Sequence, residues 1–315
     1  MAFFALLPCR DEGDIVGQSL RHALTWADEI YVFDSGSVDN TWEIVNDLAR
    51  SEKRIKPLRK QAVFFSDTRV RGYLFDRARE AMRDGDWFLR FDADEFHHIP
   101  PPEFVKTRLS RHETIVYHQY YDFKLLESDV LAWERGEQTL ADRGRPIETR
   151  RNYFVPSLYT EPRLCRYRST MRWADHVSFP FNAGFLARER LPIRHYPHRD
   201  PVQLARRVRL RFIMMADTDN RRNGTIDHWL EAEWRGLVAK DNDPELQYWA
   251  PGQELPRFQF TNHLRAPSTR MIQRAVHAFL LPLLDRTRPS FTGDSALQPL
   301  PEETQRRLIQ ELDPR

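Results

Sequence analysis

Short apolar runs alternate with segments of helical apolar spacing along the first 122 residues of the chain. In the helical segments the apolar residues recur three or four positions apart, whereas the runs between them have the length of buried strands. Strands are expected at 2–7, 29–33, 55–58, 87–91 and 114–123, and helices at 14–26, 40–48, 67–82 and 100–111. This alternation is typical of βαβ units, so we expect an α/β fold with a mostly parallel sheet.

Polar residues follow three of the expected strands at the point where each strand ends. These clusters are residues 9–12, 34–39 and 92–95. In open α/β sheets, ligands bind beyond the carboxyl ends of the strands, near the point where the strand order switches. We therefore expect the three clusters to line one binding site.

The cluster at 92–95 (DADE) ends an apolar run with three carboxylates in four residues. Carboxylates this close repel one another and resist burial unless a cation or an arginine neutralises them. Mg²⁺ and Mn²⁺ prefer oxygen ligands and usually keep positions open for substrate phosphates. The cluster therefore indicates a metal-diphosphate site, and a solvated acidic turn is the alternative.

The cluster at 34–41 (DSGSVDNT) lies between an expected strand and an expected helix. Gly36 permits a tight backbone, the serines offer hydroxyls, and Asp34 can accept hydrogen bonds from a ribose or a base. These features suit a nucleotide pocket. An ordinary turn in which Asp39 caps the next helix is the alternative.

Charge and cysteine content argue against several classes of protein. The 315 residues include 48 basic and 46 acidic ones, and the net charge of +2 gives no global basic field that would attract nucleic acid. The two cysteines indicate neither a disulfide framework nor a paired metal-ligand spacing. The apolar start is too short for a signal peptide, and no stretch reaches the roughly 20 apolar residues of a membrane span. We expect a cytoplasmic protein that at most lies at the inner face of the membrane.

Three motifs in this order resemble those of the inverting family 2 glycosyltransferases of bacterial type: residues 7–12 (LPCRDE), 27–41 (ADEIYVFDSGSVDNT) and 92–95 (DADE). The resemblance covers about the first 125 residues. It implies a Rossmann-like GT-A fold, with a mixed, mostly parallel sheet flanked by helices. It also implies transfer of a sugar from a nucleotide diphosphate donor to a hydroxyl acceptor, a glycan or a lipid-linked saccharide, with Mg²⁺ or Mn²⁺ as cofactor.

The resemblance also implies roles for individual residues. The nucleotide and the metal would be contacted by Arg10, Glu12, Asp34, Asp92 and Asp94. Among them, Asp94 would bind the metal directly and Asp92 would face the ribose or the metal. The first motif departs slightly from the family pattern, because RDE stands where Asn-Glu is common.

Two arginines lie in the segment before the DADE motif, where related enzymes also contact the nucleotide. We expect Arg71 on an exposed helix face. Arg77 could bind phosphate or lie on such a face, and we take it as a further candidate for nucleotide contact.

Inverting transfer needs a general base that deprotonates the acceptor hydroxyl. The resemblance places this carboxylate some eighty or ninety residues beyond the DADE motif, where the sequence reads WADHV. Asp175 is the candidate base, and His176 would orient it or bind the acceptor. A hydrogen-bonded loop pair is the alternative.

Residues 194–200 (RHYPHRD) resemble an element of bacterial family 2 relatives that precedes a basic helix. In GT-A enzymes a histidine late in the chain commonly returns to the metal or the diphosphate. His195, at the end of an expected strand, is therefore the candidate metal ligand, and His198 is the fallback.

The pattern loosens after residue 125, where residues 125–151 indicate a long loop or flap. Asp200, Pro201 and Gln203 have the pattern of a cap, a first-turn proline and a capping box, which predicts a helix to about Ala216. Short strands are expected at 153–159, 163–167 and 191–195, and further helices near 226–240 and 268–284.

These elements suggest a division of the chain into two parts. We place the GT-A core at 1–199, with a nucleotide-sugar half to about 125 and an acceptor half at 126–199. Residues 200–315 would form a C-terminal helical extension.

The helix expected at 268–284 is apolar on a broad face and basic elsewhere. Such a helix can lie on an anionic membrane, which would suit a lipid-linked acceptor. Core packing or a contact between two copies is the simpler interpretation. Its apolar residues are Met271, Ile272, Ala275, Val276, Phe279, Leu280, Leu283 and Leu284.

Two other functions fit parts of this pattern. A nucleotidyltransferase also joins a nucleotide pocket to metal carboxylates, but it normally has a Gly-rich phosphate loop after the first strand, and residues 7–12 contain no glycine. A non-catalytic nucleotide-sugar-binding module would keep the fold and lack the base. Release of nucleoside diphosphate from the donor separates these functions from glycosyl transfer.

Overall fold

The computed structural model describes residues 1–64, 68–173, 177–181, 183–216, 233–257, 267–287 and 297–312. The strands are β1 (Phe3–Cys9), β2 (Glu29–Asp34), β3 (Ile55–Lys60), β4 (Trp87–Arg90), β5 (Glu95–His97), β6 (Ile115–Phe123), β7 (Tyr153–Pro156), β8 (Pro162–Arg166), β9 (Leu191–His195) and β10 (Gln247–Tyr248). The α-helices are α1 (Val16–Ala23), α2 (Thr41–Ser51), α3 (Thr68–Ala78), α4 (Pro101–Arg108), α5 (Glu127–Glu134), α6 (Pro201–Ala216), α8 (Pro267–Arg286) and α9 (Glu302–Leu312). Short 3₁₀ helices lie at η1 (Leu140–Gly144), η2 (Ile147–Thr149) and η4 (Trp234–Leu237).

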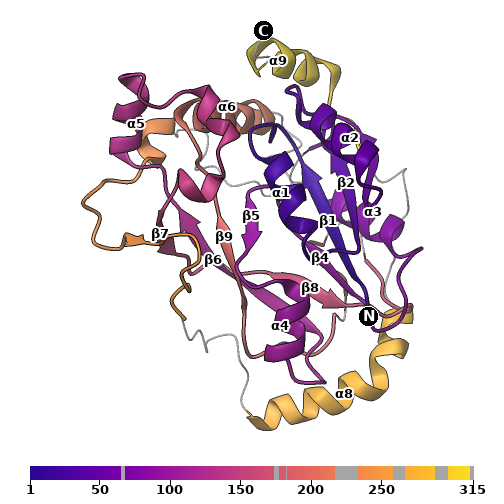
Figure 1. Cartoon of the computed structure of the whole chain (residues 1–315). Coiled ribbons are helices and arrows are strands. Elements are labelled where there is room, and N and C mark those ends of the chain that lie inside the picture. Colours follow the sequence, from indigo (N-terminus) through magenta and orange to yellow (C-terminus); the bar gives the residue numbers. More distant parts are fainter. Residues whose placement is uncertain are drawn as a thin grey trace.

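The described strands form one mixed sheet in the order β10-β7-β6-β8-β4-β1-β2-β3 (Figure 1). Strand β9 pairs with both β5 and β6. All pairs among β1 to β4 are parallel, and every antiparallel pair of the described strands includes at least one strand that follows β4, such as β8, which pairs with β4. The predicted α/β class is confirmed: a mixed, mostly parallel sheet flanked by helices, with helices in the C-terminal region.

Strand β1 lies between β4 and β2 in the sheet, and both of its faces are covered. Successive side chains of a strand point to opposite faces. Ala5 and Leu7 pack in the core that also holds buried residues of α1, α2 and α4, while Phe4 and Leu6 pack in the core shared with α3. This burial on both sides explains why β1 reads as a continuous apolar run.

Helix α6 begins with the predicted capping arrangement. The Asp200 carboxylate accepts the Gln203 backbone N–H at 2.8 Å, and the Gln203 side chain accepts the Arg199 backbone N–H at 3.0 Å. Pro201 is the first helical residue, and the helix runs to Ala216 as expected. Its C-terminal half shares a small apolar core with α9.

Residues 125–151 do not form the long loop expected from the sequence. They contain α5, η1 and η2. Val130 of α5 is buried with Leu125 and with Leu204 of α6, and Arg143 of η1 makes two hydrogen bonds of 2.9 Å to Asp200. The few apolar residues of this segment are enough to attach short helices to α6, although Arg, Glu and Gly dominate its composition.

The other two helices expected late in the chain have different outcomes. The helix expected near 226–240 lies partly outside the described residues, and its described part contains η4. Helix α8 confirms the one expected at 268–284, but core packing of its apolar face is wrong, since Phe279 is 80% and Met271 is 71% exposed.

The described helices include none with the combined length and apolar content that crossing a membrane requires.

The division of the chain at residue 199 stays a prediction.

Candidate active site

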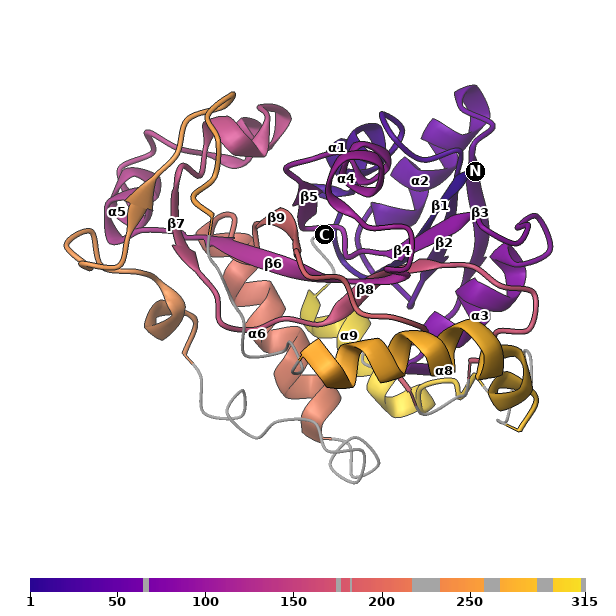
Figure 2. The same cartoon turned by 90° about the horizontal axis from the view of Figure 1, so that it is seen from below.

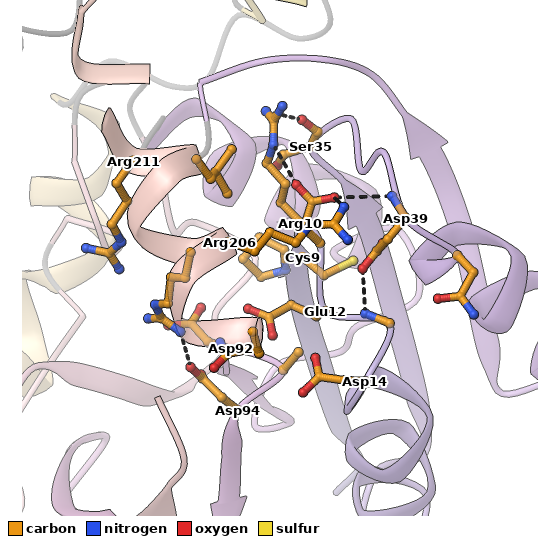
Figure 3. Close-up of a pocket in the computed structure, with 18 of the residues that line it drawn as sticks. Cys9, Arg10, Glu12, Asp14, Ser35, Asp39, Asp92, Asp94, Arg206 and Arg211 are labelled. Carbon is orange, nitrogen blue, oxygen red and sulfur yellow. Dashed lines mark hydrogen bonds and ion pairs between the residues drawn. The ribbon is translucent and has the colours of Figure 1, made fainter. Parts of the chain in front are cut away.

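A cavity of about 810 Å³ lies beyond the carboxyl ends of β1 and β4, beside α6. Its acidic lining residues are Asp11, Glu12, Asp14, Asp39, Asp92 and Asp94, and its basic ones are Arg10, Arg71, Arg143, His195, Arg206, Arg207 and Arg211. Figure 3 shows Asp92 and Asp94 beside α6, with Glu12 and Asp14 on the loop that follows β1. Ser35 and Asp39, which follow β2, line the same cavity, so all three polar clusters that follow strands meet with α6 in one space, as expected from the sequence.

Strand register brings His195 next to Asp94. Strand β5 pairs with β9 so that Glu95 lies opposite His195, and β6 pairs with β9 so that Asp122 lies opposite the same histidine. The His195 Nδ1 lies 2.7 Å from Asp122 Oδ1, and its Nε2 lies 3.6 Å from Asp94 Oδ2. The structure thus brings together two residues that were expected at the metal.

The two carboxylates determine the charge of His195. Burial alone would lower the pKa of His195, but Asp94 and the hydrogen bond to Asp122 outweigh burial and raise that pKa to about 10. Burial also works against ionisation of Asp94, yet His195 and Arg207 hold the pKa of Asp94 well below its usual range. His195 is therefore a cation between two carboxylates.

Asp94 also contacts Arg207 of α6 and Arg199, which lies just before this helix. The Arg207 Nη1 lies 2.9 Å from Asp94 Oδ2, and the Arg199 Nη1 lies 3.9 Å from the same oxygen. Both contacts fall on the oxygen that faces His195. Helix α6 therefore supplies positive charge to the carboxylate that the sequence marks as the direct metal ligand.

Asp92 is the more open carboxylate of the pair, with its side chain 40% exposed. Arg163 lies 3.1 Å and Arg90 3.8 Å from its oxygens. Burial opposes ionisation, but these two arginines lower the pKa of Asp92 to about 2. Glu95 is buried behind it and accepts the Asp92 backbone N–H at 3.1 Å, so it positions the loop.

Arg199 is a fully buried cation beneath the loop that follows β1. Its Nε lies 2.6 Å from Asp14, and its Nη2 is paired with Glu12. Burial raises the pKa of Glu12 to about 8 even though Arg199 lies beside it. Arg199 therefore connects the first strand end to the start of α6.

The loop after β1 is held in a strained conformation at Asp11, whose φ of 53° lies in the left-handed region. Its carboxylate accepts the Val38 backbone N–H at 2.8 Å, and its own N–H donates to Ser37 Oγ at 2.8 Å. The Arg206 Nη2 lies 3.2 Å from the same carboxylate. A left-handed residue of this kind costs roughly 1–2 kcal/mol, and these contacts hold it in place.

Arg10 and Asp34 hold the backbone around the cavity. Arg10 lines the cavity and donates to the Ser35 carbonyl at 2.8 Å. Asp34 is fully buried, accepts the Gly36 N–H at 2.8 Å and the Ser37 N–H at 2.6 Å, and is not among the described lining residues. A nucleotide contact by either side chain stays a prediction.

Of the two arginines of α3, Arg71 lies in a different place from the one expected. Arg71 lines the cavity, so the expectation that it lies on an exposed face is wrong. Arg77 is not among the described lining residues; its guanidinium lies 5.4 Å from the Tyr73 ring centre and 3.7 Å from Glu80. Six residues of helix rotate a side chain to another face, which explains the difference.

Two other candidates do not contribute to the described cavity. Asp175, together with His176, lies outside the described residues. His198 is not among the described lining residues, and burial together with Arg207 lowers its pKa to about 3. The choice of His195 over His198 is therefore supported by position, and the base is untested.

The sequence analysis missed the arginines of α6 and η1 that line the cavity. Arg207 and Arg211 are four residues apart on α6, so they share a face, and Arg206 lies beside them. Their spacing on a predicted helix was a usable signal. Arg143 had no such signal, because its segment resembled a loop.

Comparison with known proteins identifies the family. Residues 5–161, about half of the chain, match the family model described as Glycosyl transferase family 2. A comparison with curated proteins found no match. The mixed sheet with its flanking helices has the GT-A architecture expected from the motifs.

Two solved structures show distant likenesses. A mannosyltransferase from Pyrobaculum calidifontis, in complex with GDP-Man and Mn²⁺, is 18% identical over 36% of this chain and 34% of that chain, with a TM-score of 0.29. A mycobacterial protein is 22% identical over 50% of this chain and 57% of that chain, with a TM-score of 0.26. These likenesses span less than two thirds of either protein and do not bear on function. Through residues 5–161 the chain belongs to glycosyl transferase family 2, whose general activity is glycosyl transfer.

Proposed function

We propose that this chain transfers a sugar, with inversion, from a nucleotide diphosphate donor to a hydroxyl acceptor, a glycan or a lipid-linked saccharide of the cell envelope. The observation that carries the proposal is the meeting of Asp92, Asp94 and His195 in one cavity whose other wall is the arginine face of α6. Carboxylates suit a cation on a diphosphate, and arginines suit the phosphate oxygens themselves. A nucleotide diphosphate sugar needs both.

The proposed cofactor is Mg²⁺ or Mn²⁺, and its proposed ligands are Asp94, Asp92 and His195. In this site the ion would replace the Nε2 proton of the His195 cation. Asp122 would then hold Nδ1 and leave Nε2 toward the ion and Asp94, as in metal sites where a second carboxylate orients the histidine. The described residues contain no preformed group of three or more metal-binding side chains, so substrate oxygens would complete the coordination. When bound, the ion would stabilise negative charge on the departing diphosphate.

The other residues of the cavity have proposed roles that follow from their charge and place. Arg71, Arg206 and Arg211 would bind phosphate oxygens, since they line the cavity from two different helices. Arg10, Glu12 and Asp34 would shape the loops that receive the nucleotide. Asp175 would act as the general base on the acceptor hydroxyl.

The test is donor turnover in a panel of nucleotide sugars with Mn²⁺, with Mg²⁺ and with a chelator. We expect release of nucleoside diphosphate that depends on the metal and that falls at least about a hundredfold in Asp94→Asn. Binding of Mn²⁺ to the protein alone, measured by calorimetry, should weaken in the same variant. The matched control is Asp47→Asn, which changes an exposed carboxylate of α2 and should alter neither the release of nucleoside diphosphate nor the binding of Mn²⁺.

Several outcomes would contradict the proposal. If donor turnover is unchanged in Asp94→Asn or in the presence of a chelator, the proposed metal site is wrong. Exchange of pyrophosphate into a nucleoside triphosphate would identify a nucleotidyltransferase. A thermal shift with donor but no nucleoside diphosphate release would identify a binding module. Retained sugar transfer in Asp175→Asn would show that Asp175 is not the base. An unchanged anomeric configuration in the product would contradict inversion.

A further inference from the structure

Helix α8 is attached to the rest of the fold by its polar side. Asp285 is fully buried, and its carboxylate lies 3.0 Å from Arg168 and accepts the Thr170 hydroxyl at 2.7 Å. Near the other end of the helix, Arg270 donates to the Leu186 carbonyl at 3.1 Å and its guanidinium lies 4.6 Å from the Phe185 ring centre. These contacts fix which side of α8 faces outward.

The outward side of α8 is apolar. Its large apolar side chains, which we name the α8 apolar face, are Met271, Ile272, Phe279, Leu280, Leu283 and Leu284, each between 38% and 80% exposed. A surface helix normally turns its apolar side to the core and its polar side to water. Several large apolar side chains exposed together on one side of a helix mark an interaction surface.

The charge around the α8 apolar face is positive. Asp285 is the only acidic residue between 267 and 286 and it is buried, whereas Arg274 and Arg286 are exposed. A hollow of about 720 Å³ lies along the helix and is lined by Arg111, Arg166 and Arg274 together with two histidines. Asp84, the one carboxylate among the described residues of that lining, accepts the Ser169 backbone N–H at 2.6 Å.

We propose that α8 docks on the surface of an anionic phospholipid membrane. The acyl region would receive the α8 apolar face, and lipid phosphates would pair with the arginines at its margin and in the hollow. A second copy of this chain would complement the apolar side chains, but it would also bring α8 arginines together with no exposed α8 carboxylate to neutralise them. Charge therefore favours the membrane over a second copy.

The docking surface is separate from the proposed active site. Figure 1 places α8 at the bottom of the molecule, away from α6 and α9, and Figure 2, seen from below, shows it lying across the front. Membrane binding therefore does not depend on the donor or on the proposed reaction.

The test is flotation with vesicles of phosphatidylcholine alone and with one third phosphatidylglycerol, at low and high salt. We expect binding to the anionic vesicles that weakens as salt screens the arginines. The double variant Phe279→Ser, Leu283→Ser should partition at least about tenfold less, and Arg274→Gln and Arg286→Gln about fivefold less each. Ile309→Ser on α9 removes a side chain that is 52% exposed and should change nothing.

Other results would overturn the inference. Absence of flotation, equal binding to neutral vesicles, or unchanged binding by the double variant would each do so. A dimer in sedimentation equilibrium that the double variant dissociates would assign the face to a second copy. Thermal stabilisation by inorganic phosphate without vesicle binding would assign the hollow to a free anion.

Discussion

Replacing Arg199 by Met should destabilise the fold strongly, because this buried arginine neutralises the Asp14 carboxylate and donates a hydrogen bond to Glu12. Asp14 is 4% exposed and Glu12 is 17% exposed, while Arg199 itself has no exposed side-chain surface. Removing one partner of a buried ion pair leaves an uncompensated charge and typically costs about 3–5 kcal/mol. We therefore expect the free energy of unfolding of Arg199→Met to fall by about 4 kcal/mol, measured by urea denaturation at pH 7.

The matched control for this prediction is Arg50→Met. Arg50 lies 2.7 Å from Asp47, almost the distance between Arg199 and Asp14, but the two side chains are 80% and 65% exposed. An exposed helix pair of this kind is worth about 0.5 kcal/mol or less. The two variants therefore differ mainly in burial.

A second substitution tests the origin of the loss. If the unpaired Asp14 carboxylate causes the loss, adding Asp14→Asn to Arg199→Met should restore part of the stability, although Asp14→Asn alone destabilises the protein. The reasoning is refuted if Arg199→Met costs no more than Arg50→Met. It is also refuted if the two substitutions at Arg199 and Asp14 are simply additive.

Three further predictions concern the loops and cations of the site. Gly36→Ala should lower the free energy of unfolding by at least about 2 kcal/mol, because Gly36 has a φ of +90° and an added Cβ would lie 2.5 Å from the Ala62 Cα. The control is Gly136→Ala. Gly136 has a φ of +74° and open space around it, so this change should cost only the backbone strain of about 1 kcal/mol. Arg71→Gln should raise the KM for the donor by about tenfold, whereas Arg77→Gln on the same helix should leave it unchanged, and equal effects would remove Arg71 from the phosphate site. Burial disfavours ionisation of Asp200, but its hydrogen bonds from Arg143 outweigh burial and lower its pKa, so this carboxylate contributes stability that is present above its usual value of 3.8 and lost as pH falls through the lower folded value. Urea denaturation of Asp200→Asn should show a stability loss that is constant between pH 5 and 7, a range taken from the ordinary titration of carboxylates, and that shrinks on further acidification.

The sequence was informative where a residue's neighbours along the chain determine its environment. The apolar runs predicted β1, β2, β4 and β6 because strands buried on both faces leave little choice of residue type. The start of α6 was also predictable, since its capping hydrogen bonds join residues that are at most four positions apart. Local rules of this kind need no knowledge of the fold.

The sequence was less informative where distant segments determine the environment. The contact between His195 and Asp94 depends on the register of β5 with β9, and the buried place of Arg199 depends on carboxylates more than 180 positions earlier in the chain. The outward side of α8 is decided by Arg168 and Glu113, which hold its polar residues inward. An apolar stripe alone does not say whether a helix is buried in the core, so core packing, one of the two simpler interpretations, was wrong, while a contact between two copies stays a prediction.

The location of Arg199 and of the arginines of α6 limits which parts of the chain could be removed from this protein. The segment that matches the family ends at residue 161, yet Arg199, Arg206, Arg207 and Arg211 come after it. A fragment cut at that point would keep six acidic side chains around the cavity and lose most of the positive charge that balances them. We therefore expect a catalytically active fragment to be longer than the family segment and to extend at least through α6.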